Sequence, residues 1–239
     1  MQIHYSLDAG IATIRMDDGK RNALSPRMFK ELNAALDRAE ADRAIVIITG
    51  REEVFSAGFD LKVMKAGGAN TLRMLGAGYS ITARILAHPY PVIAAVNGHA
   101  LAMGVFLMLS SDYIIGTRGD FKISANEVAL GLTMPRVAAA MLRHRLTPAA
   151  FQTAVTLSRY FPVETARDAG FFDELAEPAA LIDRARACAA DFAKLDMFAH
   201  AASKRRIRGA LIRYIRRSVP LDLVDALAMG VKAVMRRKP

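Results

Sequence analysis

The sequence contains no tryptophan and a single cysteine, Cys188. One cysteine cannot form a disulfide within the chain, and the five histidines are scattered without the spacing of a metal site. Cys188 lies in an alanine-rich helical context, where we expect it to be a small core residue. The single cysteine excludes a domain held together by internal disulfides and favours a reducing, cytoplasmic location. The scattered histidines argue against a metal centre.

The chain also lacks an apolar stretch long enough to cross a membrane, because the longest is interrupted by Asn97, Gly98 and His99. Its first residues have neither the basic start nor the apolar run of a signal peptide. Of the 239 residues, 53% are hydrophobic and 23% are charged. We therefore expect a soluble globular protein with no membrane partner, built as one large domain or as one domain with a small appendage.

Acidic residues are scarce near the C-terminus, and this scarcity accounts for nearly all of the net charge of +10. Beyond residue 203 only Asp222 and Asp225 are acidic. The basic residues there are Lys204, Arg205, Arg206, Arg208, Arg213, Arg216, Arg217, Lys232, Arg236, Arg237 and Lys238. Four reasons for such an excess stay open: phosphates of a ligand, nucleic acid, a membrane surface or plain solubility.

Hydrophobic patterning divides the chain into an α/β body and a helical C-terminal part. Alternating or uniformly apolar runs predict strands over residues 3–7, 10–16, 44–49, 92–96 and 113–116. Ser25-Pro26 predicts a helix from there to about Ala41, with Ser25 as the N-cap. Further helices are expected over residues 71–87, in part over 125–130, and over 137–146, 148–157, 162–169, 178–195 and 198–217.

Strand signals nearly vanish after Gly131, and one more short helix is expected after Val219-Pro220. The order of strands and helices before that point is typical of a spiralling α/β domain.

The most informative stretch is residues 91–106. An uncharged, β-branched run over 92–96 meets Asn97-Gly98, and small apolar residues follow from Ala100. This pattern predicts a buried strand, a tight turn and a helix buried on all sides, so that backbone N–H groups point at the turn. Such a turn can hold an anion or an oxygen atom that gains negative charge. An ordinary buried strand-helix crossover explains the same residues equally well.

Two other segments carry candidate chemistry. Residues 55–62, Phe-Ser-Ala-Gly-Phe-Asp-Leu-Lys, follow the strand at 44–49 and contain a second glycine turn. In Asn126-Glu127 a carboxylate has apolar neighbours along the chain, namely Ala125, Val128, Ala129 and Leu130. Apolar surroundings raise the pKa of a carboxyl group, which suits it to proton transfer.

Five segments in this order resemble the crotonase superfamily, which contains the enoyl-CoA hydratases and isomerases. They are residues 20–24, 55–62, 97–104, 126–135 and 161–170. The resemblance extends to about residue 235 and implies a crotonase-type α/β spiral of β-β-α units over residues 1–197. It also implies a helical trimerisation region over residues 198–239, which packs on the core or on a neighbouring subunit, and hence a homotrimer or hexamer.

The resemblance further implies an oxyanion hole made by the backbone N–H groups of Phe59 and Met103. These groups would bind the thioester oxygen of an acyl-CoA as an enolate forms, and losing one such donor typically costs on the order of 100- to 1000-fold in rate. Asp60 is expected to cap the next helical turn near CoA rather than to act as a base. The residues implied in CoA or substrate binding are Arg21, Ala23, Ala57, Asp60, Leu61, Lys62, Gly104, Phe106 and Asn126.

Two departures from the family pattern bear on the reaction. Hydratases of the family hold water with two glutamates, and one of these positions is Phe106 while the other, Glu127, is kept. A lone glutamate beside an apolar residue matches the isomerases that convert 3-enoyl-CoA to 2-enoyl-CoA, so Glu127 is the expected acid/base. In addition, Met103 replaces the middle residue of the family's three glycines and narrows the pocket.

Three other functions stay open. They are a hydratase or another crotonase reaction on a CoA thioester, a non-catalytic acyl-CoA binder, and nucleic-acid binding through the basic C-terminal residues. Nucleic-acid binding is the least favoured, because the basic stretch holds one aromatic residue, Tyr214. His99 is expected to be a satisfied, partly buried side chain. No cofactor is expected, since coenzyme A is part of the substrate.

Overall fold

The computed structural model describes residues 1–235, so Arg236, Arg237 and Lys238 of the predicted basic segment lie outside the described residues. The strands are β1 (Ile3–Asp8), β2 (Ile11–Met16), β3 (Ala23–Leu24), β4 (Ile45–Thr49), β5 (Glu53–Ser56), β6 (Gly58–Phe59), β7 (Val92–Val96), β8 (Gly98–Leu101), β9 (Tyr113–Thr117), β10 (Ile123–Ser124) and β11 (Glu174–Ala176). The helices are α1 (Pro26–Ala41), α2 (Leu61–Ala66), α3 (Gly68–Ala87), α4 (Met103–Leu109), α5 (Arg136–Arg145), α6 (Pro148–Leu157), α7 (Val163–Ala169), α8 (Leu181–Phe192) and α9 (Met197–Met235), with 3₁₀ turns η1 (Val128–Leu130) and η2 (Pro178–Ala180).

The main sheet has six strands in the order β1-β2-β4-β7-β9-β11. β1 and β2 are antiparallel, and every other neighbouring pair is parallel. β4 and β7 are buried along their whole length because both faces of the sheet are covered. Val46 and Ile48 face the main core, while Ile45 and Ile47 face α8. Cys188 lies in the α8 cluster, so its predicted place in the core is confirmed.

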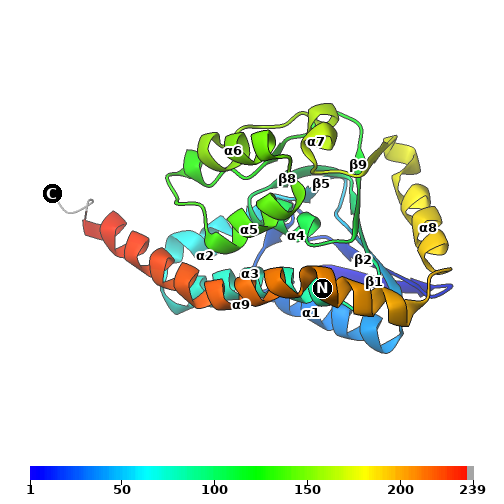
Figure 1. Ribbon diagram of the computed structural model, residues 1–239. Coiled ribbons are helices and arrows are strands. Elements are labelled where there is room, and N and C mark those ends of the chain that lie inside the picture. Colours follow the sequence, from blue (N-terminus) through cyan, green and yellow to red (C-terminus); the bar gives the residue numbers. More distant parts are fainter. Residues whose placement is uncertain (236–239) are drawn as a thin grey trace.

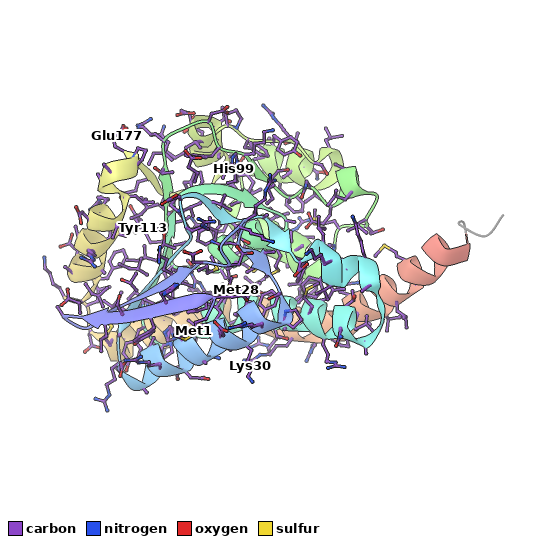
Figure 2. The ribbon with its side chains drawn as sticks, turned by 180° about the vertical axis from the view of Figure 1, so that it is seen from behind. Met1, Met28, Lys30, His99, Tyr113 and Glu177 are labelled. Carbon is purple, nitrogen blue, oxygen red and sulfur yellow. The ribbon has the colours of Figure 1, made fainter. Side chains whose placement is uncertain are left out.

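Figures 1 and 2 show how the helices surround this sheet. α9 runs along one side of the molecule beside α3 and also contacts α5 (Figure 1). Figure 2 shows Tyr113 of β9 beside α8, where its ring packs edge-on against Phe192 at a centroid distance of 5.7 Å. None of the helices in residues 1–235 combines the length and apolar character that a membrane span needs.

The sequence-based interpretation of residues 97–109 was wrong in one respect. Asn97-Gly98 does not lead into a helix, because β8 begins at Gly98 and pairs in parallel with β5 and β10 in a second sheet. The turn into α4 comes later, at Ala102. Asn97 joins the two sheets, since its Oδ1 accepts a hydrogen bond from the N–H of Gly50 at 2.9 Å. Pairing with β5 and β10, which lie far away in the chain, is what makes residues 98–101 a strand.

Among the other predicted helices and strands, the structure confirms some and corrects others. Ser25 caps α1 as predicted, and its hydroxyl accepts from the N–H of Met28 at 3.1 Å. Residues 125–130 form only the 3₁₀ turn η1, and the short strand β11 follows the region where strand signals were expected to end. β11 is three residues long and pairs with β9, so it has too little sequence of its own to show a period.

The predicted helix break at Val219-Pro220 was also wrong, because α9 is continuous through Pro220. Proline has a helical φ but no N–H, so a helix can continue through it with the loss of one hydrogen bond. Two residues later, Asp222 accepts hydrogen bonds from the backbone N–H groups of Arg136 and Val137, each at 3.0 Å. This attachment to the first turn of α5 holds the second half of α9 against the body.

Candidate functional site

Two loops that the sequence analysis assigned to CoA lie side by side. β3 pairs in parallel with β6, placing Ala23 opposite Gly58. The N–H of Ala57 donates to the carbonyl of Arg21 at 3.0 Å, and the N–H of Asp60 donates to the carbonyl of Leu24 at 3.3 Å. The structure therefore brings the predicted CoA-contacting residues of both loops into one place.

Asp60 has the capping position that was predicted for it. Its carboxylate accepts from the N–H of Lys62 at 2.8 Å and from that of Val63 at 3.4 Å, which fixes the start of α2. Leu61 and Lys62 follow on the surface, and 62% of Leu61 is exposed. An exposed leucine and lysine at the mouth of a site can contact a ligand that carries both apolar and phosphate groups.

The two predicted oxyanion-hole turns pack directly against each other. A Cβ atom on Gly58 would lie 2.9 Å from the carbonyl oxygen of Leu101 and 3.3 Å from the amide nitrogen of Met103. Gly58 also has a φ of +88°, which side chains rarely tolerate. The chain can approach Met103 this closely only because residue 58 has no side chain.

Met103 begins α4, and the N–H groups in the first turn of an α-helix have no partner within the helix. Ala102, which precedes it, has a φ of +47°, an unusual value for a residue with a side chain. Gly104 packs on Ser56, since a Cβ at Gly104 would lie 2.6 Å from the Ser56 carbonyl oxygen. The Met103 side chain is buried in the main core.

The side chain of Phe59 is directed into a cluster of aromatic rings. Its ring packs edge-on against Phe29 at 6.0 Å and against Tyr79 at 5.9 Å. Gly78 makes room for the ring, because a Cβ there would lie 2.5 Å from it. These contacts fix the backbone at Phe59, whose N–H is the other predicted oxyanion donor.

Glu127 is a buried carboxyl group that has no counterion among the described residues. It is 6% exposed, and its Oε2 has no hydrogen-bond partner among the described residues. Burial raises the pKa of Glu127 to about 7, because the charged form loses its hydration. At neutral pH both protonation states are populated, as a proton shuttle requires.

The reason given for this pKa from the sequence holds only in part, because Ala125 is the one buried residue among the four apolar chain neighbours. The chain neighbours Val128, Ala129 and Leu130 are exposed, at 42% for Val128 and 56% for Leu130. The 3₁₀ turn points them outward, and segments distant in the sequence bury Glu127 instead. Asn126 lies beside it, and its Oδ1 is also buried without a partner among the described residues.

Phe106 occupies the position at which hydratases of the family have their other glutamate, and it is an apolar core residue. Phe106 is 1% exposed, and all residues of α4 are buried, none of them charged. Glu127 therefore has no second carboxylate in α4 with which to hold a water molecule.

The other polar side chains considered from the sequence are His99 and possible metal ligands. The Nδ1 of His99 (labelled in Figure 2) accepts from the N–H of Lys122 at 2.9 Å. Its ring packs edge-on against Phe121, as expected for a satisfied side chain. Within residues 1–235, no group of three or more His, Cys, Asp or Glu side chains is arranged to hold a metal ion.

The basic C-terminal segment is not a uniform surface. Lys204 and Arg208, 4% and 7% exposed, form ion pairs with Asp112 at 2.6 and 2.8 Å. Arg205, Arg206, Arg213, Arg216 and Arg217 are exposed on the other side of α9. Two residues of the stretch considered for nucleic-acid binding therefore attach α9 to the body.

A groove of about 490 Å³ lies between α1, α3 and α9 and contains none of the predicted site residues. The site is thus identified by its backbone turns and by Glu127. Sequence reasoning missed two residues near the site, Tyr79 and Asp222. Asp222 was noted only as one of the two acidic residues beyond residue 203. The negative charges of Asp222 and Glu127 add to burial in raising the pKa of Tyr79. No local pattern marks either residue, because their positions depend on the packing of α3, α5 and α9.

Comparison with known proteins agrees with this arrangement. A family model described as enoyl-CoA hydratase/isomerase matches residues 6–217. A probable enoyl-CoA hydratase of Mycobacterium avium (strain 104) is 34% identical over 203 residues, covering 83% of this chain and 78% of that protein. The crystal structure of a probable enoyl-CoA hydratase from Mycobacterium tuberculosis H37Rv is 40% identical, with a TM-score of 0.92 and 100% of each chain covered.

An apo structure of the same Mycobacterium tuberculosis protein, described there as the Mtb enoyl-CoA isomerase, matches with 42% identity and a TM-score of 0.89, with 93% of this chain covered and 98% of that chain. The predicted crotonase-type fold and family are therefore confirmed. This chain is a member of the enoyl-CoA hydratase/isomerase family, whose enzymes act on CoA thioesters.

Proposed function

We propose that this protein is an enoyl-CoA isomerase that moves a double bond from C3 to C2 of an acyl-CoA, with Glu127 as its only acid/base. The observation that carries the proposal is the buried Glu127 carboxyl, which has a pKa of about 7 and lacks a carboxylate partner in α4. A single group that both accepts and returns a proton works best when its pKa lies near the operating pH.

The reaction needs one proton to leave and one to return. Ionised Glu127 takes a proton from C2 of 3-enoyl-CoA, and the electron pair spreads through the thioester carbonyl to give a dienolate. The N–H groups of Phe59 and Met103 donate to the enolate oxygen. Protonated Glu127 then delivers the proton to C4, the double bond moves to C2–C3, and the glutamate is again ionised.

An isomerase is favoured over a hydratase because hydration needs a water molecule that is held and activated. Phe106 is 1% exposed and offers no polar atom to such a water. A dry site favours direct proton transfer between the carboxyl group and carbon. The name of the Mycobacterium tuberculosis relative adds nothing to this choice, because one structure of that protein is described as an isomerase and another as a probable hydratase.

Hydration of 2-enoyl-CoA is the second candidate, and it is supported by the name of the Mycobacterium avium relative, a probable enoyl-CoA hydratase. In that reaction Glu127 would activate water without help from a second glutamate. An acyl-CoA binder without catalysis is the third candidate, but the Met103 side chain, which was expected to narrow the pocket, is buried in the main core and gives it no support.

One assay with two substrates distinguishes these functions. Purified protein is given 3-enoyl-CoA to measure 2-enoyl-CoA formation, and separately 2-enoyl-CoA to measure hydration. Glu127→Gln is compared with Glu164→Gln, an exposed glutamate of α7 whose side chain is 61% accessible. We expect isomerisation by the wild type and by Glu164→Gln, a loss of about 100- to 10,000-fold in Glu127→Gln, and hydration near background.

Robust hydration by the wild type, lost in Glu127→Gln, would overturn the isomerase in favour of the hydratase. Binding of acyl-CoA without turnover of either substrate would identify the non-catalytic binder.

A further inference from the structure

Among the described residues, the Oε2 atom of Glu127 has no hydrogen-bond partner. The one hydrogen bond that acts on the pKa of its carboxyl group comes from the backbone N–H of Glu127 itself. The direction of the carboxyl therefore depends on the backbone of the segment that carries it. That segment runs from Ala125, directly after β10, to Pro135, directly before α5.

Two attachments fix this segment to the body. On the η1 side, the N–H of Ala129 donates to the hydroxyl of Ser158 at 3.0 Å. On the α5 side, the N–H groups of Arg136 and Val137 each donate to one carboxylate oxygen of Asp222 at 3.0 Å. The turn between them is closed by its own backbone, with the N–H of Leu132 donating to the carbonyl of Glu127 at 2.9 Å.

Asp222 reaches this position from α9, more than eighty residues away in the chain, and is 4% exposed. Its charge is compensated by the guanidinium of Arg136 at 3.1 Å, and the same guanidinium contacts the exposed Asp225 at 2.5 Å. A carboxylate at a helix N-terminus that accepts two N–H groups is more firmly held than a neutral cap, because the helix dipole adds to both hydrogen bonds.

Tyr79 gives an independent sign that Asp222 lies near the chemistry. Its side chain is 4% exposed and packs edge-on against Phe59. Burial raises the pKa of Tyr79, and the charges of Asp222 and then Glu127 raise it further. The negative charges of the two carboxylates, from α9 and from the Glu127 segment, therefore both act on the Tyr79 side chain.

We propose that Asp222 is a positioning residue of the active site, which aims Glu127 by fixing the first turn of α5 from the C-terminal helix. The proposal rests on the proposed acid/base role of Glu127. Asp222 does not touch the substrate, and its effect passes through the backbone of residues 127–137. α9 then has a second task besides packing, since its residues past Pro220 hold the catalytic segment in its working position.

Asp222→Asn is the direct test, with Asp225→Asn and Arg136→Met as matched controls. Asparagine has the shape of aspartate, but its NH₂ group cannot accept from the second N–H, so one of the two attachments is lost. Asp225→Asn removes an exposed carboxylate one helical turn away. Arg136→Met removes the ion pairs but keeps both backbone hydrogen bonds to Asp222.

The first readout is isomerisation. We expect kcat of Asp222→Asn to fall by about 10- to 100-fold with KM changed by less than about twofold, because a catalytic group misplaced by 1 Å can cost about 100-fold. Both controls are expected to stay within about threefold of the wild type. A change in KM alone, or an equal loss in Asp225→Asn, would overturn the proposal.

The second readout does not need activity. Glu127→Gln is placed in the wild-type and Asp222→Asn backgrounds, and urea unfolding is measured from pH 5 to pH 9. The stabilisation by Glu127→Gln reports how strongly Glu127 is desolvated. We expect this stabilisation to shrink in the Asp222→Asn background, because a loosened segment admits water to the carboxyl. An unchanged stabilisation would overturn the proposal.

The two readouts separate the two hypotheses. If the wild type does not isomerise 3-enoyl-CoA, the proposed function fails while the unfolding measurement still decides the role of Asp222. If Asp222→Asn does not fold, Asp222→Ser supplies a hydroxyl acceptor for one N–H and takes its place in both measurements.

Discussion

Gly58 and Met103 lie so close that a Cβ atom on Gly58 would be 3.3 Å from the amide nitrogen of Met103. Gly58 lies in β6, whereas Met103 is the first residue of α4. Their contact sets the separation of the two backbone N–H groups proposed to bind the enolate oxygen. A side chain at residue 58 would push these turns apart.

Gly58→Ala is therefore expected to lower kcat/KM for isomerisation by about 100-fold or more, the effect of losing an oxyanion donor. The added Cβ would meet the Leu101 carbonyl at 2.9 Å, and the φ of +88° adds strain. Gly10→Ala is the control, because Gly10 has a φ of +76° but open space around a Cβ. Steady-state kinetics of both variants checks this, and equal losses would show that strain alone is responsible.

The rate should depend on the ionisation of Glu127. The base accepts a proton only when it is deprotonated, and burial raises its pKa to about 7. We expect kcat/KM to fall as the pH drops below about 7 and to level off above it. A profile of kcat/KM from pH 5 to pH 9 measures this. A rate that is flat down to pH 5 would mean that Glu127 is not the base.

The raised pKa of Glu127 also predicts how the stability of the folded protein depends on pH. The folded protein keeps the Glu127 proton up to about pH 7, whereas an unfolded glutamate loses it near its ordinary pKa of 4.5. The wild type therefore loses stability as the pH rises from about 4.5 to about 7, and Glu127→Gln escapes this loss. We expect Glu127→Gln to be more stable by about 3 kcal/mol above pH 7 and to lack this gain below pH 4.5.

Urea unfolding of both proteins at pH 4 and pH 8 checks that prediction, with Glu164→Gln as the exposed control. An inactive variant that is more stable than the wild type would also exclude misfolding as the cause of lost activity. A variant that is less stable at pH 8 would contradict the assigned burial cost.

The attachment of α9 to the body should depend on Asp112. Its carboxylate contacts Lys204 at 2.6 Å and Arg208 at 2.8 Å, and it accepts from the N–H of Val92 at 2.7 Å. Asp112→Asn leaves two buried cations without their partner, and we expect it to lower the free energy of unfolding by about 3–5 kcal/mol.

Equilibrium unfolding in urea measures this loss. Asp191→Asn is the comparison, because it breaks the exposed pair of Asp191 with Lys194 and should change stability little. An effect of Asp112→Asn as small as that of Asp191→Asn would mean that water reaches the ion pairs and that they do not hold α9.

Much of the fold could be predicted because the relevant information lies within a few residues. The uniformly apolar strands β4 and β7 and the capped start of α1 follow from local patterns. The family segments brought together Arg21, Ala57 and Asp60, and they led to Glu127 before its burial was known. The roles of Phe59 and Met103 as oxyanion donors, and of the predicted CoA contacts, stay predictions.

Tertiary structure decided what local patterns could not. Glu127 is buried although its apolar neighbours Val128 and Leu130 are exposed, because distant segments cover it. Lys204 is buried because Asp112, 92 residues away in the chain, neutralises it. α9 continues through Pro220, where the N-terminus of α5 holds Asp222. Sequence patterns determine which residues favour a helix, a strand or the core, whereas the burial and pairing of a charge depend on which distant groups arrive beside it.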